Sequence, residues 1–180
     1  MEENQRVRLT KKMLKDSLLK LLKRKNIQKI SIKEICDLAQ INRSTFYKYY
    51  STEYDLLKDI KNEHFFAMQE FLKLTDSNLT ILKFLKYIDE NAEFFKLMLD
   101  TLNNIDFLEQ LLPVCFSKMN YDEKLEKYKN STKQEYMFQF LIYGCINVIK
   151  KWLFNERRET LQEMNLILVD LISKFFRKNI

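Results

Sequence analysis

The chain has 180 residues with 31 Lys and Arg, 25 Asp and Glu and one His, which gives a formal net charge of +6. Gly and Pro occur once each, whereas an average protein contains about 7% Gly and about 5% Pro. Folds built on tight hairpins, Gly-rich P-loops and Rossmann nucleotide sites are therefore excluded, because their turns and phosphate loops require these residues. What remains is an all-α protein.

The first predicted helix covers residues 10–25. Its apolar side chains recur at intervals of three and four residues, which is the pattern of a helix with one buried face. Asn26 can end this helix in a left-handed conformation, which Asn tolerates better than most residues. We expect Arg6 and Arg8, ahead of the helix, to lie in a disordered tail rather than in an arm that reaches a minor groove.

Two short helices follow in quick succession. The first covers about residues 31–40 and begins with a capping box, in which the Ser31 hydroxyl and the Glu34 carboxylate each accept a backbone N–H of the other residue. The second covers residues 42–50, with Asn42 as its N-cap. Two such short helices joined by about three residues are typical of a helix-turn-helix.

The remainder of the chain is predicted to form a helical body. Helical patterns recur over residues 52–75, 79–91, 91–100, 104–119, 133–154 and 157–178. Ser51 and Thr52 cap the first of these helices, and Pro113 should kink or break the fourth. The polar segment 120–133 is either a loop or a short exposed helix. Together with the N-terminal elements, this gives about nine helices.

The positive charge is concentrated at the N-terminus. Residues 1–61 contain 15 basic and 8 acidic residues, a net charge of +7, whereas residues 62–180 contain 16 and 17, a net charge of −1. A basic segment joined to a near-neutral one is typical of a nucleic-acid-binding head on a neutral body. The alternative is a Lys-rich surface without a polyanionic partner. In residues 62–180, however, acidic residues balance the basic ones, so the positive excess is confined to the N-terminal segment.

The stretch from residue 10 to residue 57 resembles the DNA-binding domain of the TetR (tetracycline repressor-like) family of bacterial transcription regulators. The matching residues are, in order, Thr10, Ser31, Ile32, Ile35, Ala39, Ile41, Asn42, Thr45, Phe46, Tyr47, Tyr50, Ser51, Asp55, Leu56 and Leu57. Their collinear order makes the resemblance specific. It implies a three-helix helix-turn-helix domain over residues 1–55 and a helical ligand-binding and dimerisation domain over residues 56–180.

Three positions depart from the family pattern. Gln40 and Asn26 stand where the family usually has Gly, and a Gln in the left-handed conformation costs about 1 kcal/mol. Glu53 stands where the family often has a Lys that contacts a phosphate. We expect no phosphate contact from Glu53, because a carboxylate repels a phosphate.

The resemblance and the residue types together predict which side chains meet DNA. The first turn of the recognition helix points into the major groove, where Arg43 can pair with a guanine edge. Tyr47 either bonds a phosphate or only packs. The predicted DNA-binding residues are Ser31, Lys33, Asn42, Arg43, Ser44, Thr45, Tyr47, Lys48 and Tyr49.

The resemblance also implies roles for the body. A homodimer is expected to form through the last two helices, at Phe138, Ile142, Ile146, Ile149, Leu161, Met164, Leu168, Leu171 and Phe175. A small apolar inducer is expected among the middle helices, lined by Phe65, Met68, Phe84, Tyr87, Phe95, Met98, Phe107 and Phe116. The alternatives are burial of the last two helices within one subunit and an ordinary core of aromatic and Met side chains.

The sequence offers little for catalysis or cofactor binding. Cys36, Cys115 and Cys145 have no metal-ligand spacing and are expected to be free, buried thiols, and the single histidine, His64, supports no catalytic role. No apolar run reaches the roughly 18–20 residues of a membrane span, and the N-terminus has no signal-peptide pattern. We therefore expect a cytoplasmic protein that is not an enzyme, has no cofactor and does not enter a membrane.

The predicted function is that of a DNA-binding transcription regulator, a ligand-responsive repressor that binds a palindromic double-stranded operator as a dimer. The alternative is a helical ligand-binding or interaction protein of the same fold that reads no DNA sequence, which Gln40 and Glu53 favour. The two differ in whether duplex DNA binds with the steep salt dependence that phosphate contacts produce.

Overall fold

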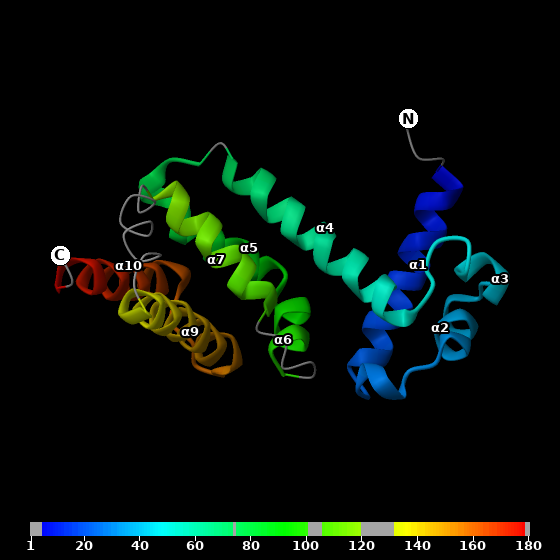
Figure 1. The fold of residues 1–180 in the computed structure, drawn as a ribbon. Coiled ribbons are helices and arrows are strands. Elements are labelled where there is room, and N and C mark those ends of the chain that lie inside the picture. Colours follow the sequence, from blue (N-terminus) through cyan, green and yellow to red (C-terminus); the bar gives the residue numbers. More distant parts are fainter. Residues whose placement is uncertain (1–4, 74, 101–105, 120–131, 179–180) are drawn as a thin grey trace. The chain divides into compact units, whose positions relative to one another are not determined.

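The computed structural model describes residues 5–73, 75–100, 106–119 and 132–178 (Figure 1). These residues form nine α-helices and two short 3₁₀ helices and contain no β-strand, which confirms the all-α prediction. The chain separates into two compact units. The first contains the chain from Gln5 to His64, and the second contains most of the chain from Phe65 onward.

The first unit is built from α1 (Gln5–Leu22), α2 (Ile32–Ala39), α3 (Arg43–Phe46) and the first part of α4 (Glu53–Lys73). α1 packs against α2, and α2 packs against α3. The core of the unit includes the buried side chains Leu14, Leu18, Leu22, Ile35, Phe46, Leu56 and Ile60. The three leucines belong to the apolar stripe that periodicity predicts for the first helix.

α1 begins five residues earlier than predicted. Arg6 and Arg8 lie in its first turns, so the expectation of a disordered tail at these positions was wrong. Thr10 is therefore not the first residue of the helix. It lies within α1, where its hydroxyl donates to the Arg6 carbonyl four residues earlier (2.8 Å). The segment before Thr10 contains no Gly or Pro that would stop helix growth towards the N-terminus.

The two turns that lack the family's usual Gly are built differently. Gln40 adopts the left-handed conformation (φ 56°, ψ 40°) as the C-cap of α2, so the turn keeps the usual shape at a steric cost, and it is the one non-Gly residue with positive φ in the described part of the chain. The left-handed prediction for Asn26 was wrong. Asn26 is extended (φ −62°) and caps a 3₁₀ helix, Ile27–Lys29, by accepting the N–H of Gln28 (3.1 Å).

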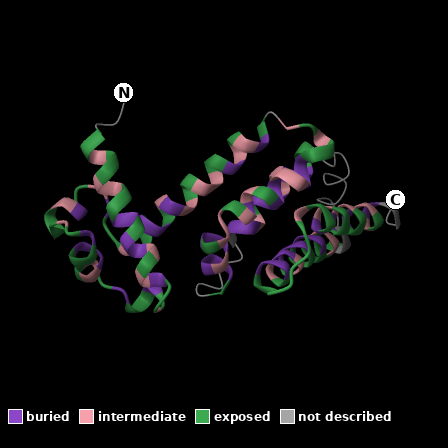
Figure 2. Cartoon of the chain, turned by 180° about the vertical axis from the view of Figure 1, so that it is seen from behind, coloured by how far each residue is buried: buried purple, intermediate pink, exposed green. Residues whose placement is uncertain are grey.

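The second unit contains the 3₁₀ helix Ser77–Leu79 and five α-helices: α5 (Thr80–Glu90), α6 (Ala92–Asp100), α7 (Asp106–Lys118), α9 (Thr132–Phe154) and α10 (Leu161–Lys178). α5 and α9 each pack against both α7 and α10. Buried residues recur along these helices, at the spacing expected of a shared helical core (Figure 2).

Pro113 does not break its helix, contrary to one of the two predicted outcomes. α7 continues through it as one α-helix. The flanking Leu111, Leu112, Cys115 and Phe116 are all buried. Their burial offsets the roughly 3 kcal/mol that an interior Pro costs a helix.

The last helix begins at Leu161, four residues later than predicted. The Glu163 carboxylate accepts both the backbone N–H and the hydroxyl of Thr160, each at 2.8 Å, and the Thr160 hydroxyl accepts the Glu163 N–H (3.3 Å). This capping box sets the helix start, and the sequence analysis overlooked it. The predicted loop or exposed helix at 120–133 lies, up to residue 131, outside the described residues.

All three cysteines are free and buried, as predicted. Burial raises the pKa of Cys36 and Cys115, and it raises the pKa of Cys145 to about 12. Within the described ranges, no helix is both long and apolar enough to cross a membrane. In the same ranges, no three His, Cys, Asp or Glu side chains gather in a way that could hold a metal ion.

Replacing Gln40 by Gly should stabilise the protein by roughly 1 kcal/mol, because Gly adopts a φ of 56° without the steric cost of a β-carbon. Urea unfolding followed by circular dichroism gives the free energy of unfolding. Gln40→Ala is the control, since Ala keeps the β-carbon and should change that free energy by less than about 0.5 kcal/mol. Equal stability of the Gly and Ala variants would show that the turn carries no strain.

Candidate nucleic-acid interface

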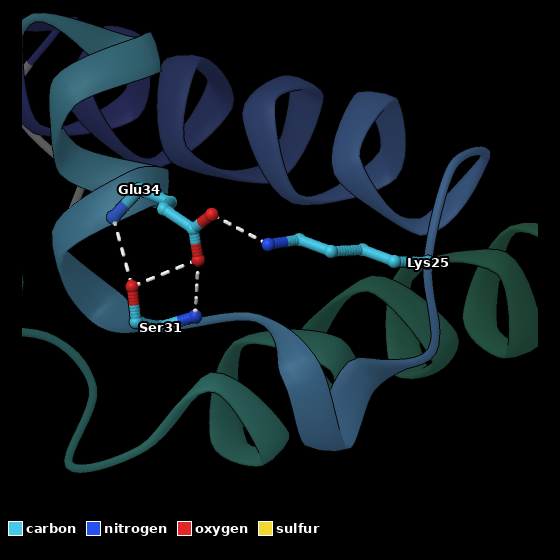
Figure 3. A network of polar contacts seen from close by, with 3 residues as sticks. All are labelled: Lys25, Ser31 and Glu34. Atoms are coloured by element: carbon cyan, nitrogen blue, oxygen red, sulfur yellow. Dashed lines mark hydrogen bonds and ion pairs between the residues drawn. The ribbon is translucent and has the colours of Figure 1, made fainter.

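The N-terminus of α2 is fixed by a cluster of three polar side chains, Lys25, Ser31 and Glu34 (Figure 3). Glu34 accepts the Ser31 backbone N–H and hydroxyl, each at 2.9 Å, and the Ser31 oxygen accepts the Glu34 N–H (3.3 Å). The predicted capping box is therefore confirmed. Lys25 adds an ion pair to the other carboxylate oxygen (2.5 Å). These contacts, led by the Lys25 hydrogen bond, lower the pKa of Glu34 to about 2.

The second helix of the helix-turn-helix is shorter than predicted. α3 contains four residues and ends at Phe46. Beyond it the chain continues in tighter turns, because the N–H groups of Lys48 and Tyr49 bond carbonyls three residues back (3.3 and 2.9 Å). Asn42 occupies the N-cap position, but its side chain makes no capping hydrogen bond.

A polar surface surrounds the one fully buried side chain of α3, Phe46. Of the nine predicted DNA-binding residues, seven are exposed and two, Thr45 and Tyr49, are half-buried. The exposed seven are Ser31, Lys33, Asn42, Arg43, Ser44, Tyr47 and Lys48. Tyr47 is 58% exposed, so it does not pack into the core. The structure thus presents these side chains from the start of α2, from α3 and from the turn after it.

Ser31 and Tyr49 have additional contacts within the protein. The hydrogen of the Ser31 hydroxyl is donated to Glu34, so a phosphate contact from this hydroxyl would have to break that hydrogen bond, although the two backbone N–H bonds of the capping box would remain. The ammonium of Lys11, on α1, lies 5.7 Å from the centre of the Tyr49 ring. This cation–π contact connects α1 to the turn after α3.

The N-terminus of α4 is capped by its own carboxylate. Asp55 accepts the backbone N–H groups of Ser51 (3.2 Å) and Thr52 (3.0 Å), and the Thr52 hydroxyl accepts the Asp55 N–H (3.1 Å). Glu53, which replaces the family's Lys, lies in the same first turn. Negative charge therefore occupies the helix end that would otherwise attract a phosphate.

The residues predicted to line a ligand pocket lie in or beside the core of the second unit. Met68, Phe84, Phe95, Met98, Phe107 and Phe116 are buried, and Phe65 and Tyr87 are half-buried. The structure brings several of these rings together: Phe95 lies 5.9 Å from Phe107 and 6.2 Å from Tyr87, and Phe94 lies 5.4 Å from Phe95 and 5.6 Å from Phe107. Burial raises the pKa of Tyr87.

The residues predicted for the dimer interface divide between two sides of the last helices. Ile142, Ile146, Ile149, Met164 and Leu168 are buried within the chain, Phe138, Leu161 and Phe175 are half-buried, and Leu171 is 46% exposed. The apolar side chains that α9 and α10 do expose include Tyr136, Phe140, Tyr143, Leu166 and Ile167, together with Leu171. Apart from Leu171, the sequence analysis did not name them.

The family of the chain follows from its second unit. A TetR C-terminal family model, described as "Transcriptional regulator C-terminal region", matches residues 76–174, which is more than half of the chain. The chain belongs to the TetR family. It is accordingly a transcriptional regulator, of a family whose members bind DNA. The TetR-family resemblance of residues 10–57 is thereby confirmed by an independent match in the C-terminal part of the chain.

Solved structures show the same fold along nearly the whole chain. A TetR transcriptional regulator from Streptococcus agalactiae 2603V superposes with a TM-score of 0.70 at 21% identity, covering 94% of this chain and 96% of that one. The dihydroxyacetone kinase operon activator DhaS gives a TM-score of 0.61 at 20% identity, covering 93% and 96%. A TetR-family regulator from Streptomyces coelicolor gives 0.58 at 14% identity, covering 91% and 81%.

One curated relative matches over a short segment. An uncharacterized HTH-type transcriptional regulator of Bacillus subtilis (strain 168), YxbF, is 38% identical over 47 residues. The match covers 26% of this chain and only 12% of the relative's length. It adds a helix-turn-helix regulator to the proteins that this TetR-family chain is similar to.

An ion-pair cluster around the buried Lys15 of the first unit escaped the sequence analysis of this TetR-family chain. Lys15 is only 8% exposed, and its ammonium lies 2.7 Å from an Asp59 oxygen and 2.6 Å from a Glu63 oxygen. A signal was available, because Lys15 precedes Leu18 and Leu22 by three and seven residues and so shares their face of α1. Two carboxylates one turn apart on the next long helix were the matching partners.

The ion pair at Glu34 should make stability depend on pH in a defined window. Its folded-state pKa of about 2 lies below the ordinary value of 4.5, so its stabilisation is present above about pH 4.5 and is lost as the pH falls towards 2. We expect the wild type to have a higher thermal midpoint than Glu34→Gln at pH 7, and the difference to shrink between pH 5 and pH 2.

Glu163→Gln is the comparison for this measurement. Glu163 forms the same capping box with Thr160, but hydrogen bonds rather than an ion pair lower its pKa. Its substitution should therefore give a smaller change over the same pH range. A Glu34→Gln variant whose midpoint runs parallel to that of the wild type from pH 7 to pH 2 would contradict the role given to the Lys25 ion pair.

Proposed function

We propose that this TetR-family regulator is a repressor that binds a palindromic DNA operator with sequence specificity. The observation that carries the proposal is the exposed first turn of α3, where Asn42, Arg43 and Ser44 all face solvent while Phe46 anchors the helix from behind. The guanidinium of Arg43 can pair with both acceptors of a guanine edge, and Asn42 can pair with adenine in the same way.

Phosphate contacts supply the affinity that base contacts direct. Tyr47 and Lys48 are exposed in the turn directly after α3, and Lys33 is exposed on the preceding helix, α2. The net charge of +7 in residues 1–61 favours a polyanion over other macromolecules. No phosphate contact is proposed at the N-terminus of α4, which Asp55 caps.

We place the dimer interface on the exposed sides of α9 and α10. Gly144 lies in the middle of α9, where Gly costs a helix about 1 kcal/mol relative to Ala. A β-carbon at this position would meet no atom within 4 Å, so packing within the chain does not require a glycine there. A partner helix that approaches α9 closely gives this glycine a role, and the exposed rings of Tyr136, Phe140 and Tyr143 supply apolar surface beside it.

A twofold dimer explains the palindrome. Two recognition helices about 34 Å apart meet successive major grooves on one side of the duplex. Release requires a ligand with different affinities for the DNA-competent state and the other state. The buried aromatic cluster around Phe95 favours a small apolar ligand, because its rings offer it no ionised partner. The regulator is proposed to act in the cytoplasm, where its free thiols stay reduced.

Selection of bound sequences from a pool of random DNA duplexes tests the proposal. We expect the wild type to enrich a near-palindrome, and its affinity for that sequence to fall steeply as salt rises. A reporter gene placed behind the selected sequence then gives the direction of regulation, with lower expression expected for a repressor. Absence of any enriched sequence would instead favour an interaction protein that keeps the fold without reading DNA.

Arg43→Ala should relax the enriched sequence at one base pair of each half-site, at a cost of about 1–3 kcal/mol for the wild-type operator. Lys23→Ala, which removes the same charge at an exposed position near the end of α1, is the control and should leave the base preference intact. An equal loss on every sequence after Arg43→Ala would assign Arg43 to a phosphate rather than to a base.

A large side chain at position 144 should weaken the proposed dimer. Gly144→Leu places a large side chain where the partner helix is proposed to approach, and overpacking of this kind costs about 1–3 kcal/mol. We expect sedimentation velocity to show the monomer at concentrations where the wild type is dimeric. Gln110→Leu, at an exposed position of α7 and so outside the proposed interface, is the control and should remain dimeric. A Gly144→Leu dimer as stable as the wild type would place the interface elsewhere.

A further inference from the structure

The ion-pair cluster in the first unit has a fourth member. The Tyr50 hydroxyl donates to the same Asp59 oxygen that pairs with Lys15, and both distances are 2.7 Å. Tyr50 lies in the turn after α3, Lys15 lies on α1, and Asp59 and Glu63 lie on α4. A single carboxylate therefore connects the segment that follows the recognition helix to two other helices.

Apart from its packing on α2 and the Lys11–Tyr49 contact, α3 has little else to hold its orientation. It contains only four residues, far fewer than the roughly 12–15 that an isolated helix needs to be even marginally stable. Phe46 is its one fully buried side chain, and one apolar contact leaves a helical turn free to rotate about it because apolar packing is not directional. A second, directional contact is needed to fix where Asn42 and Arg43 point.

Tyr50 provides that directional contact. Its backbone N–H donates to the Phe46 carbonyl (3.0 Å), so it lies one turn after Phe46, and the two rings are in contact with centroids 5.8 Å apart. Tyr50 is only 7% exposed. The hydroxyl hydrogen bond to an ionised acceptor is of the stronger, charge-assisted kind, and it fixes the direction of the ring as well as its depth.

Asp59 is held in the form that accepts this bond. Burial alone would raise its pKa, but hydrogen bonds from Lys15 and Tyr50 together with the charge of Lys15 outweigh burial and lower it. Lys15 is pinned in turn by Glu63 on its other side. The nearly buried ammonium thus serves the geometry of the cluster and is not presented to DNA.

We propose that Tyr50 and Asp59 are positioning residues for DNA recognition: through one hydrogen bond they set the orientation of α3 and thereby the specificity with which its first turn reads base pairs. The role assigned to them requires no contact of either residue with DNA. The inference rests on the proposed function, since it assigns a role in the sequence-specific binding described above.

The test measures affinity for the operator selected by the wild type and for a scrambled duplex of equal length. Tyr50→Phe removes only the hydroxyl and keeps the buried ring. Asp59→Ala removes the acceptor, and Asp59→Asn returns an oxygen that can still accept from Tyr50. Glu63→Ala is the matched control, because it removes the same charge and the other partner of Lys15 but leaves the Tyr50–Asp59 bond in place.

We expect Tyr50→Phe and Asp59→Ala to lower the ratio of operator to scrambled affinity about tenfold, the size of one mismatched base pair. The slope of log affinity against log salt should not change, because no phosphate contact is lost. Asp59→Asn should recover part of the ratio, and Glu63→Ala should keep the wild-type ratio. In the double variant Tyr50→Phe/Asp59→Ala, the loss should equal that of Asp59→Ala alone, because both act through one bond.

Two failures of this experiment are distinguishable. If the wild type selects no sequence, the proposed function fails. If the wild type selects an operator and Tyr50→Phe, folded by its thermal midpoint, keeps the wild-type ratio, the positioning role is refuted. Additive losses in the double variant would also refute it, because they would show that Tyr50 and Asp59 act independently.

Discussion

The fold depends on side-chain capping, because a chain with one Gly and one Pro has almost no other way to start and stop its helices. Ser31 with Glu34, Thr52 with Asp55 and Thr160 with Glu163 each exchange reciprocal hydrogen bonds at a helix start. Asn26 and Asp76 cap the two 3₁₀ helices through their side-chain oxygens. Where no cap suffices, at the turn of the helix-turn-helix, Gln40 adopts the left-handed backbone itself.

The basic residues of the first unit serve two purposes that the net charge cannot separate. Arg43 and Lys48 face solvent, whereas Lys15 and Lys25 are consumed in ion pairs with Asp59, Glu63 and Glu34. Lys15 and Lys25 therefore stabilise the packing of the helices, and Arg43 and Lys48 are available to a polyanion. An electrostatic argument for DNA binding is therefore carried by fewer cations than the composition suggests.

The sequence was sufficient to predict what is set by local spacing. The capping box at Ser31 and the exposed first turn of α3 depend on residues within one or two turns of each other. The Lys15 cluster joins residues 44 and 48 positions apart, and only the packing of α1 on α4 shows that they meet. α9 shows the same limit, because periodicity marks Ile142 and Ile146 as apolar but does not show whether they face the chain's own core or a partner.

The three buried thiols give the molecule internal reporters of local opening. Cys36 lies in the first unit, and Cys115 and Cys145 lie in the second. Each has a raised pKa and is shielded from solvent, so an alkylating reagent reaches it only when the surrounding helices part. The rate at which each thiol is alkylated therefore reports how often the helices around it open. A bound operator or ligand would lower that rate in the unit that it stabilises.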